Sequence, residues 1–228
     1  MSPRERSLIL RDHEVRAVLA GRKVQHRVPC RDQSAVAYEW AEGMTTLPPG
    51  TTYTGWAKCI HEGSGLLVPT KGPLGAPGDL LWVREAFVVA HINTWGGLPK
   101  SRDPECAERA AYYRAGFDRS PPSWRPSTQM PRWASRITLR VKRVWVERVQ
   151  DASDKAIRAL GVAEWARAGG VVLAPVVAFD GVRAREGKIL AKPNRVAFAS
   201  WWNDRYAKKG FRWDKDPWCW ACEWEMVS

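Results

Sequence analysis

Several segments of this sequence alternate apolar and polar residues with a period of two, and this pattern constrains the fold more than any other feature. Side chains along a β-strand point alternately to opposite faces, so the pattern is typical of strands with one buried face. In Ser135–Val149, the residues Ile137, Leu139 and Val141 fall on one face and basic residues fall on the other. We predict strands of this kind over Lys23–Val28, Ser135–Val149 and Pro217–Val227.

The remaining predicted elements are a buried strand, a few short helices and two irregular segments. The apolar run Leu80–Val89 has the length of a buried strand. Helical spacing of apolar residues predicts helices over Asp12–Ala20, Asp151–Trp165 and Phe198–Tyr206. Gly and Pro clusters predict loop-rich insertions at about 32–76, with a hairpin around Tyr53–Ile60, and at about 93–130. Strands and helices do not alternate as in βαβ units, so we expect one α+β domain over 1–228, built on a small β-barrel.

The charge balance is strongly basic. Thirty-six Lys and Arg against 24 Asp and Glu leave a net charge of +12, and the isoelectric point is near 9.8. Residues 1–31 carry eight basic and three acidic residues, a net of +5, and residues 121–148 carry seven basic residues and one acidic residue, a net of +6. This clustering favours a polyanionic partner over an evenly solvated basic surface.

The five cysteines are odd in number and scattered, unlike the framework of a small secreted protein. Cys219 and Cys222 are three residues apart in a predicted strand, so they point to opposite faces, and no second Cys/His pair at zinc-finger spacing follows. We expect Cys222 in the core, Cys219 on the outer face, and neither metal nor cofactor. No apolar run approaches the roughly 20 residues of a membrane helix, and the first residues do not resemble a signal peptide. We therefore expect a cytoplasmic protein with no membrane partner.

Fourteen tryptophans exceed what a core of this size requires, and several lie beside an arginine. Guanidinium groups neutralise phosphate while indole rings stack on bases, a combination that holds single-stranded or flipped nucleotides. Most tryptophans in strands serve packing, but Trp82 and Trp133 are flanked by loops and charge. The candidate nucleic-acid-binding residues are Arg22, Arg27, Trp82, Arg84, Arg132, Trp133 and Arg136. We expect them to meet around a single hollow with an aromatic wall.

Four blocks of the sequence, in this order and spacing, resemble the ASCH-domain proteins of bacteriophages and prophages. They are LAGRKVQHR at 19–27, GAPGDLLWVRE at 75–85, MPRWASRI at 130–137 and the strand at 218–225. The resemblance covers most of the chain. It implies a PUA-like β-barrel, a fold shared by RNA-binding domains and readers of modified bases, with a cleft lined by the Gly-x-Lys motif at 21–23.

The same resemblance suggests a possible activity. Some small bacterial members hydrolyse N4-acetylcytidine with a lysine, a threonine three residues later and a glutamate on a later helix. Lys23 matches that lysine, whereas His26 stands at the threonine position and Leu160 at the glutamate position, with Glu164 out of register. A lysine with a lowered pKa can activate a hydroxyl group and a carboxylate can shuttle protons. The candidate catalytic residues are Lys23, His26 and Glu85.

Three functions are consistent with the sequence. The first is binding of RNA, single-stranded DNA or a modified nucleoside in a basic cleft lined by tryptophan. The second is an amidohydrolase acting on N4-acylated cytidine. The third is a non-catalytic module that docks another phage or host protein through its tryptophan-rich surface. The sequence does not predict an oligomeric state.

Overall fold

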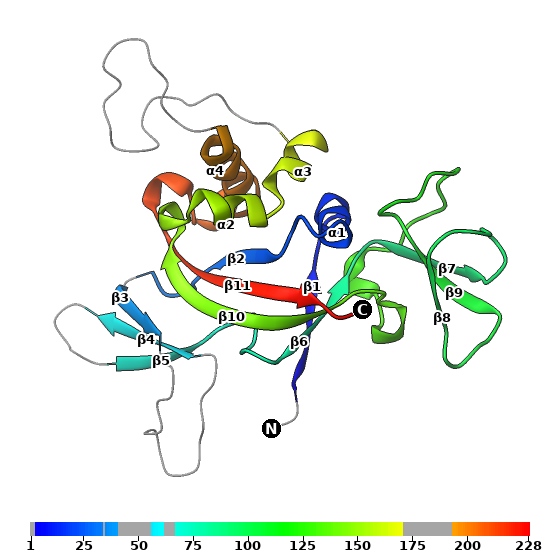
Figure 1. The fold of residues 1–228 in the computed structure, drawn as a ribbon, viewed down its shortest axis with the longest axis horizontal. Helices are drawn as coiled ribbons and strands as arrows, with labels where there is room; N and C mark the ends of the chain where they lie inside the picture. The colour runs from blue at the N-terminus through cyan, green and yellow to red at the C-terminus, as the bar shows by residue number, and fades with distance from the viewer. Residues whose placement is uncertain (1–2, 34, 41–55, 62–66, 171–192) are drawn as a thin grey trace.

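The structure is a computed structural model that describes residues 3–33, 35–40, 56–61, 67–170 and 193–228. Within these residues the chain forms three β-sheets and a few short helices, which confirms the mixed α+β class. Figure 1 shows a central sheet with α2, α3 and α4 above it and one smaller sheet toward each end. No helix among the described residues combines the length and apolar character needed to span a bilayer.

All four predicted strands contribute to the central sheet, at neighbouring positions. Its spatial order is β1 (Glu5–Ile9), β6 (Leu80–Arg84), β10 (Thr138–Arg148), β11 (Trp218–Met226) and β2 (Gln25–Pro29). Neighbouring strands are antiparallel, except that β1 and β6 are parallel. Strands β1 and β2 are the two edges, and no ladder joins them within the described residues. The sheet is therefore open here, in contrast to the closed barrel that the sequence predicted.

A β-bulge in β10 changes which residues face the core. The pairing of β10 with β11 shifts register between Val141 and Arg143. Val141 and Val144 are both 1% exposed, although residues three apart in a regular strand point to opposite faces. The extra residue at the bulge explains this. Beyond the bulge, Trp145 points away from the core that Val144 enters, the reverse of what unbroken alternation predicts.

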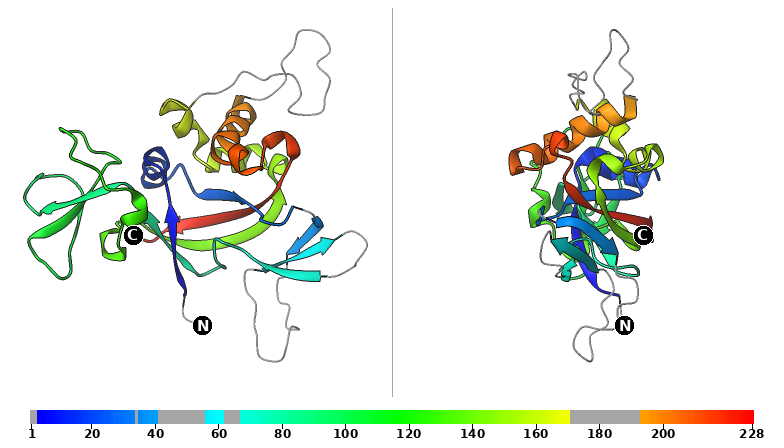
Figure 2. Two further views of the ribbon diagram at one scale, coloured as in Figure 1. Left: turned by 180° about the vertical axis from the view of Figure 1, so that it is seen from behind. Right: turned by 90° about the vertical axis from the view of Figure 1, so that its left-hand side faces the viewer.

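The central sheet has a hydrophobic core on each face. The first core joins the sheet to α1 (Asp12–Leu19). The second core is formed by α2 (Asp154–Ala159), α3 (Val162–Arg167), α4 (Pro193–Tyr206) and the beginning of β11. Figure 2 shows, from behind and from one side, that these three helices gather on one side of the sheet.

The two cysteines of β11 lie in different cores. Cys222 is buried in the first core, as predicted. Cys219 points to the other face, also as predicted, but it is 0% exposed. The expectation of an outer position was wrong because the helices cover that face. Burial raises the pKa of both thiols, that of Cys222 to about 12.

The two smaller sheets replace much of the predicted irregular structure. One contains β3 (Ala35–Trp40), β4 (Trp56–His61) and β5 (Leu67–Lys71), so the insertion at 32–76 holds a three-stranded sheet. A hairpin was expected around Tyr53–Ile60, but the described part of this segment belongs to the single strand β4, which pairs with β3 and β5; Tyr53 to Gly55 lie outside the described residues. The other sheet contains β7 (Phe87–His91), β9 (Arg109–Tyr113) and β8 (Lys100–Arg102), in this order. The predicted strand Leu80–Val89 thus divides into β6 and β7, which belong to different sheets.

The predicted helices exist with changed boundaries. Helix α1 has Arg11 as its N-cap, and the Glu14 side chain accepts a hydrogen bond from the Arg11 backbone N–H at 3.0 Å. The segment Asp151–Trp165 forms two helices because the chain turns at Gly161, whose φ is +72°. The predicted helix Phe198–Tyr206 is the second half of α4.

Candidate functional site

The candidate site lies on the helix-covered face of the central sheet, where three strands place polar side chains in rows. Directly paired residues on neighbouring strands point to the same face. Ala221 of β11 pairs with both Arg27 of β2 and Trp145 of β10, so these three form one row. The neighbouring row consists of Gln25, Glu223 and Arg143. The small side chain of Ala221 is buried beneath Arg27 and Trp145, whose guanidinium carbon and ring centroid are 5.9 Å apart.

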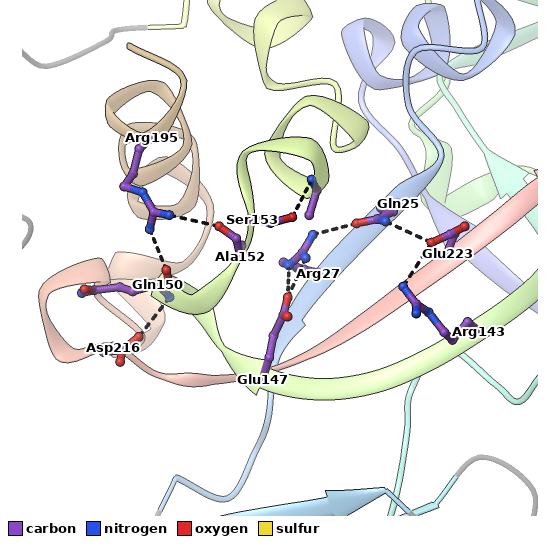
Figure 3. Close-up of polar contacts among 11 residues, drawn as sticks. Gln25, Arg27, Arg143, Glu147, Gln150, Ala152, Ser153, Arg195, Asp216 and Glu223 are labelled. Carbon is purple, nitrogen blue, oxygen red and sulfur yellow. Dashed lines mark hydrogen bonds and ion pairs between the residues drawn. The ribbon is translucent and has the colours of Figure 1, made fainter. Parts of the chain in front are cut away.

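Arg27 forms part of the floor of the site and is fully buried. Its Nε and Nη2 lie 2.8 and 2.5 Å from Oε1 of Glu147, and its Nη1 donates to Oε1 of Gln25 at 3.2 Å. Figure 3 shows the guanidinium group held between these two side chains. A buried charge is tolerated when it is paired and hydrogen-bonded in this way. The ion pair therefore fixes the orientation of the Arg27 guanidinium.

Trp145 forms an aromatic wall beside these charges. The guanidinium carbon of Arg143 lies 4.3 Å from the centroid of the indole ring, and that of Arg27 lies 5.9 Å from it. Both distances are within the range of cation–π attraction. The indole is half-buried, so part of it remains accessible. A planar aromatic ligand could stack there.

Helix α2 forms the roof of the site, and α4 holds its beginning in place. Ser153 caps α2 by accepting a hydrogen bond from the Ala156 N–H at 3.2 Å. Arg195 of α4 donates to the carbonyl oxygens of Gln150 at 2.6 Å and Ala152 at 3.2 Å. Figure 3 shows the contacts of Arg195 to the left of Arg27. The roof is therefore a fixed part of the fold.

A cleft of about 500 Å³ lies between this roof and the strands, and we call it the α2 cleft. Its charged lining residues are Arg27, Arg143, Lys155, Glu147, Asp151 and Glu223. Three positive and three negative side chains give a formal charge of zero. Its volume falls within the range of small-molecule sites, and its polar groups surround an indole. These properties suit an uncharged planar group such as a nucleobase.

A second cleft of about 450 Å³ adjoins the first, and we call it the α2–α3 cleft. The two clefts share Val24, Lys155 and Ala159 as lining residues. The charged residues of the α2–α3 cleft are Arg22, Lys155, Arg158, Arg167 and Glu164, a net of +3. Arg22 was predicted from the sequence to bind nucleic acid. A neutral cleft with an aromatic wall thus continues directly into a basic one.

Lys23 and His26 come together below these clefts, around the carboxylate of Glu14 from α1. The Lys23 Nζ lies 3.6 Å from Glu14 Oε1, and the His26 Nδ1 lies 3.9 Å from it. Arg205 of α4 forms a shorter ion pair with Glu14 at 2.8 Å. Lys23 also donates to the carbonyl oxygens of Gln25 and Leu160 at 3.0 and 2.8 Å. We call Glu14, Lys23, His26 and Arg205 the buried charge cluster.

Burial and charge determine protonation in this cluster. Burial lowers the pKa of Lys23 to about 8, although Glu14 opposes the shift. Burial also lowers the pKa of His26 well below its usual value, and Lys23 adds to this effect. Burial disfavours ionisation of Glu14, but Arg205, Lys23 and His26 outweigh it, so its pKa is well below normal. The side chains of Lys23, His26 and Glu14 are at most 2% exposed. The cluster is therefore closed to a substrate.

Glu85, the third candidate catalytic residue, lies elsewhere. It follows β6 and accepts two hydrogen bonds from Arg136, both of 2.9 Å. The guanidinium carbon of Arg136 lies 4.0 Å from the ring centroid of Tyr113. Burial raises the pKa of Glu85, and Arg136 opposes that shift. Glu85 and Arg136 thus form a largely buried structural ion pair.

Trp82, Arg84 and Arg132 form a third group, on the opposite part of the sheet. The guanidinium carbons of Arg84 and Arg132 lie 5.5 and 5.8 Å from the centroid of Trp82. Arg132 also pairs with Glu5 at 3.0 Å. Trp133 packs against a separate small core beside Phe87 and Tyr113.

The structure therefore does not gather the predicted residues around a single hollow. Strand β6, which carries Trp82 and Arg84, is separated from β2, which carries Arg27, by β10 and β11. Three strand spacings amount to roughly 14 Å, beyond the reach of one small ligand. Of the predicted residues, Arg22 and Arg27 line the two joined clefts.

Several residues of the site were not predicted from the sequence. The bulge places Trp145 and Glu147 in the α2 cleft, and its only sequence signal is the spacing of Val141, Val144 and Val146 by three and then two residues. Glu14 had no local signal, because its partners are distant in the chain. No group of His, Cys, Asp or Glu suited to hold a metal ion occurs in the described parts of the chain.

Comparisons of the chain with protein-family models, curated proteins and solved structures find no match.

Proposed function

We propose that the chain binds RNA or single-stranded DNA, with an unpaired base, modified or not, entering the α2 cleft. The observation that carries the proposal is the half-buried indole of Trp145, which lies beside the guanidinium groups of Arg27 and Arg143 in that cleft. Stacking of a base on an aromatic side chain contributes about 1–3 kcal/mol. The partly exposed Arg143 and Glu223 offer hydrogen bonds to base edges, whereas the buried Arg27 orients Gln25 and Glu147.

The adjoining α2–α3 cleft favours a nucleic-acid strand over a free nucleoside as the ligand. A nucleoside carries no phosphate and gains nothing from a cleft of net charge +3. In a nucleic-acid strand, the nucleotide whose base occupies the neutral α2 cleft has a phosphate on each side of its sugar. Lys155 lines both clefts, so a backbone leaving the α2 cleft passes this lysine before reaching Arg22 and Arg158.

We also propose that the fold is PUA-like and of the ASCH type. Three features support this: the mixed α+β sheet, the match of the sequence blocks, and the part that the Gly-x-Lys segment takes in the clefts. Gly21 and Arg22 of that segment line the α2–α3 cleft together with Val24, whereas Lys23 is buried and is not among the lining residues.

Fluorescence anisotropy with a labelled single-stranded oligonucleotide tests the binding proposal. Trp145→Ala should weaken binding roughly 5- to 150-fold, the loss equivalent to about 1–3 kcal/mol of stacking. Trp133→Ala is the matched control, because Trp133 is also half-buried but packs against a different core. No binding at low salt, or equal losses in both variants, would overturn the proposal.

Salt dependence tests the basic cleft separately. For a single strand, each phosphate that the protein no longer neutralises makes the slope of log K against log salt shallower by about 0.7. Arg158→Gln should make this slope shallower, whereas Arg140→Gln, which replaces an exposed arginine outside the clefts that is paired with Glu225, should leave it unchanged. A slope that both variants leave unchanged would argue against a backbone path through the α2–α3 cleft.

The geometry gives less support to the two alternatives. Hydrolysis of N4-acylated cytidine by Lys23 would require the substrate to reach a side chain that is 0% exposed and bonded to two carbonyl oxygens. Incubation with N4-acetylcytidine should therefore release no cytidine; release that Lys23→Ala abolishes would favour the hydrolase. Capture of a protein partner that survives nuclease treatment and is lost when Trp82 is replaced would support the docking function.

A further inference from the structure

A third cleft lies apart from the proposed binding site, at the beginning of α1. It has a volume of about 690 Å³ and is lined by residues of α1, by Arg114 and by the segment Trp124–Ser127. We call it the α1 cleft. None of its lining residues lines either of the clefts around α2. Its ligand can therefore be considered independently of the proposed function.

The α1 cleft is strongly basic. Its charged lining residues are Arg11, Arg16, Arg114, Arg125 and Asp12, a net of +3. Asp12 is paired with Arg114 at 2.6 Å, and Arg11 is paired with Asp204 at 2.7 Å. No ion pair to Arg16 or Arg125 is found in the part of the chain that the structure describes. Two exposed guanidinium groups thus face this cleft without a carboxylate partner among those residues.

His13 provides an independent sign of a ligand. It lines the α1 cleft and also a neighbouring cleft of about 550 Å³. The residue is 9% exposed, and its Nε2 is buried without a hydrogen-bond partner among the described residues. Buried polar atoms in folded proteins are almost always hydrogen-bonded, so such an atom needs an explanation. Burial lowers the pKa of His13, which keeps the ring neutral at pH 7 and able to donate one hydrogen bond.

The backbone at the beginning of α1 adds to the positive charge of the α1 cleft. Helix α1 begins at Asp12, and the first N–H groups of a helix carry partial positive charge and lack intrahelical partners. Phosphate groups bind readily at such positions. Trp124, which is half-buried, provides an aromatic surface in the same cleft.

We propose that the α1 cleft binds a phosphate ester, and that a nucleoside monophosphate is the ligand that fits it best. Arg16 and Arg125 hold the phosphate, His13 Nε2 donates a hydrogen bond to the ligand, and Trp124 contacts the base. Guanidinium–phosphate pairs are charge-assisted and among the stronger hydrogen bonds in proteins.

Isothermal titration with inorganic phosphate, adenosine and AMP tests this proposal. The titrations use the Trp145→Ala variant, so that a base entering the α2 cleft does not contribute. We expect AMP to bind more tightly than phosphate, and adenosine to bind at least tenfold more weakly than AMP. Arg16→Gln and Arg125→Gln should each weaken AMP binding about tenfold or more. Both arginines are exposed, so these variants should fold normally.

Arg102→Gln is the matched control, because Arg102 is an exposed arginine that lines none of the α1, α2 and α2–α3 clefts. It should leave AMP binding unchanged. His13→Phe keeps an aromatic ring but removes the donor, and it should weaken phosphate as well as AMP binding. The proposal is overturned by the absence of saturable AMP binding, by adenosine binding as tightly as AMP, or by equal losses in the Arg16, Arg125 and Arg102 variants. None of these outcomes affects the oligonucleotide proposal, which depends on Trp145.

Discussion

Replacing Glu14 by Gln changes few atoms but should lower the stability of the fold strongly. Its carboxylate is 1% exposed and compensates Arg205 at 2.8 Å and Lys23 at 3.6 Å. Glu14→Gln keeps the volume and leaves no cavity, but it leaves two cations without their partner. Breaking a buried ion pair in this way costs about 3–5 kcal/mol. For a chain of this size, such a loss corresponds to a fall in Tm of roughly 6–20 °C.

Urea denaturation at pH 7 measures the change in the free energy of unfolding, with two controls. Asp204→Asn removes a pair with Arg11 that is about half exposed, which should cost at most about 1 kcal/mol. Lys23→Met in the Glu14→Gln background removes one unpaired cation and should recover part of the loss. A loss below about 1 kcal/mol for Glu14→Gln, equal to that of Asp204→Asn, would refute the argument from buried charge.

The pH dependence gives a second measure of the same residue. The pKa of Glu14 is lower in the folded than in the unfolded chain, so its contribution to stability is present above about pH 4.5 and is lost as the pH falls. The difference in stability between the parent and Glu14→Gln should therefore shrink below pH 4.5. A difference that stays constant with pH would indicate that charge is not the cause.

Three further measurements address other parts of the structure. The pKa of Lys23 is about 8 in the folded chain and about 10.4 when unfolded, so the free energy of unfolding should rise as the pH increases from 8 to 9.5. Urea denaturation of Lys23→Met at the same pH values should lack that rise. Gly161→Ala should lower the Tm more than Gly97→Ala. Both glycines have positive φ, but only at Gly161 would the new Cβ lie 3.1 Å from Ala17 and Lys23. In the native protein iodoacetamide should label Cys106, which is partly exposed, well before Cys219 and Cys222, as peptide mapping by mass spectrometry would show.

Local patterns predicted most of the elements of the central sheet but not the partners that make the site. Alternation located β2, β10 and β11, because large apolar side chains recur at every second position on the face that packs into the first core, even though β11 also reaches the second core. Alternation did not identify Trp145 as a site residue, because the bulge reverses the faces beyond Val141. The break between β6 and β7 was missed because the apolar run continues through Ala86, although Glu85 there pairs with Arg136.

The clefts and the buried charge cluster depend on contacts between distant segments. Glu14 meets Arg205 across 191 residues, and Arg27 meets Glu147 across 120 residues. Nothing local in the sequence marks such pairs. The basic composition did predict a polyanionic partner, but it could not show that a neutral cleft lies beside a basic one. That difference arises from the acidic residues that the fold brings to the α2 cleft.

The position of β11 has a consequence for how the chain reaches this structure. It lies between β10 and β2 and contributes to both hydrophobic cores, yet its partner Gln25 is 198 residues away from Glu223. The entropy of closing so long a loop is lost before either core is complete. Chains dominated by such non-local pairing reach the native state slowly. Until β11 docks, the apolar side chains of both cores remain exposed to water, and an incompletely folded chain is correspondingly prone to associate with other copies.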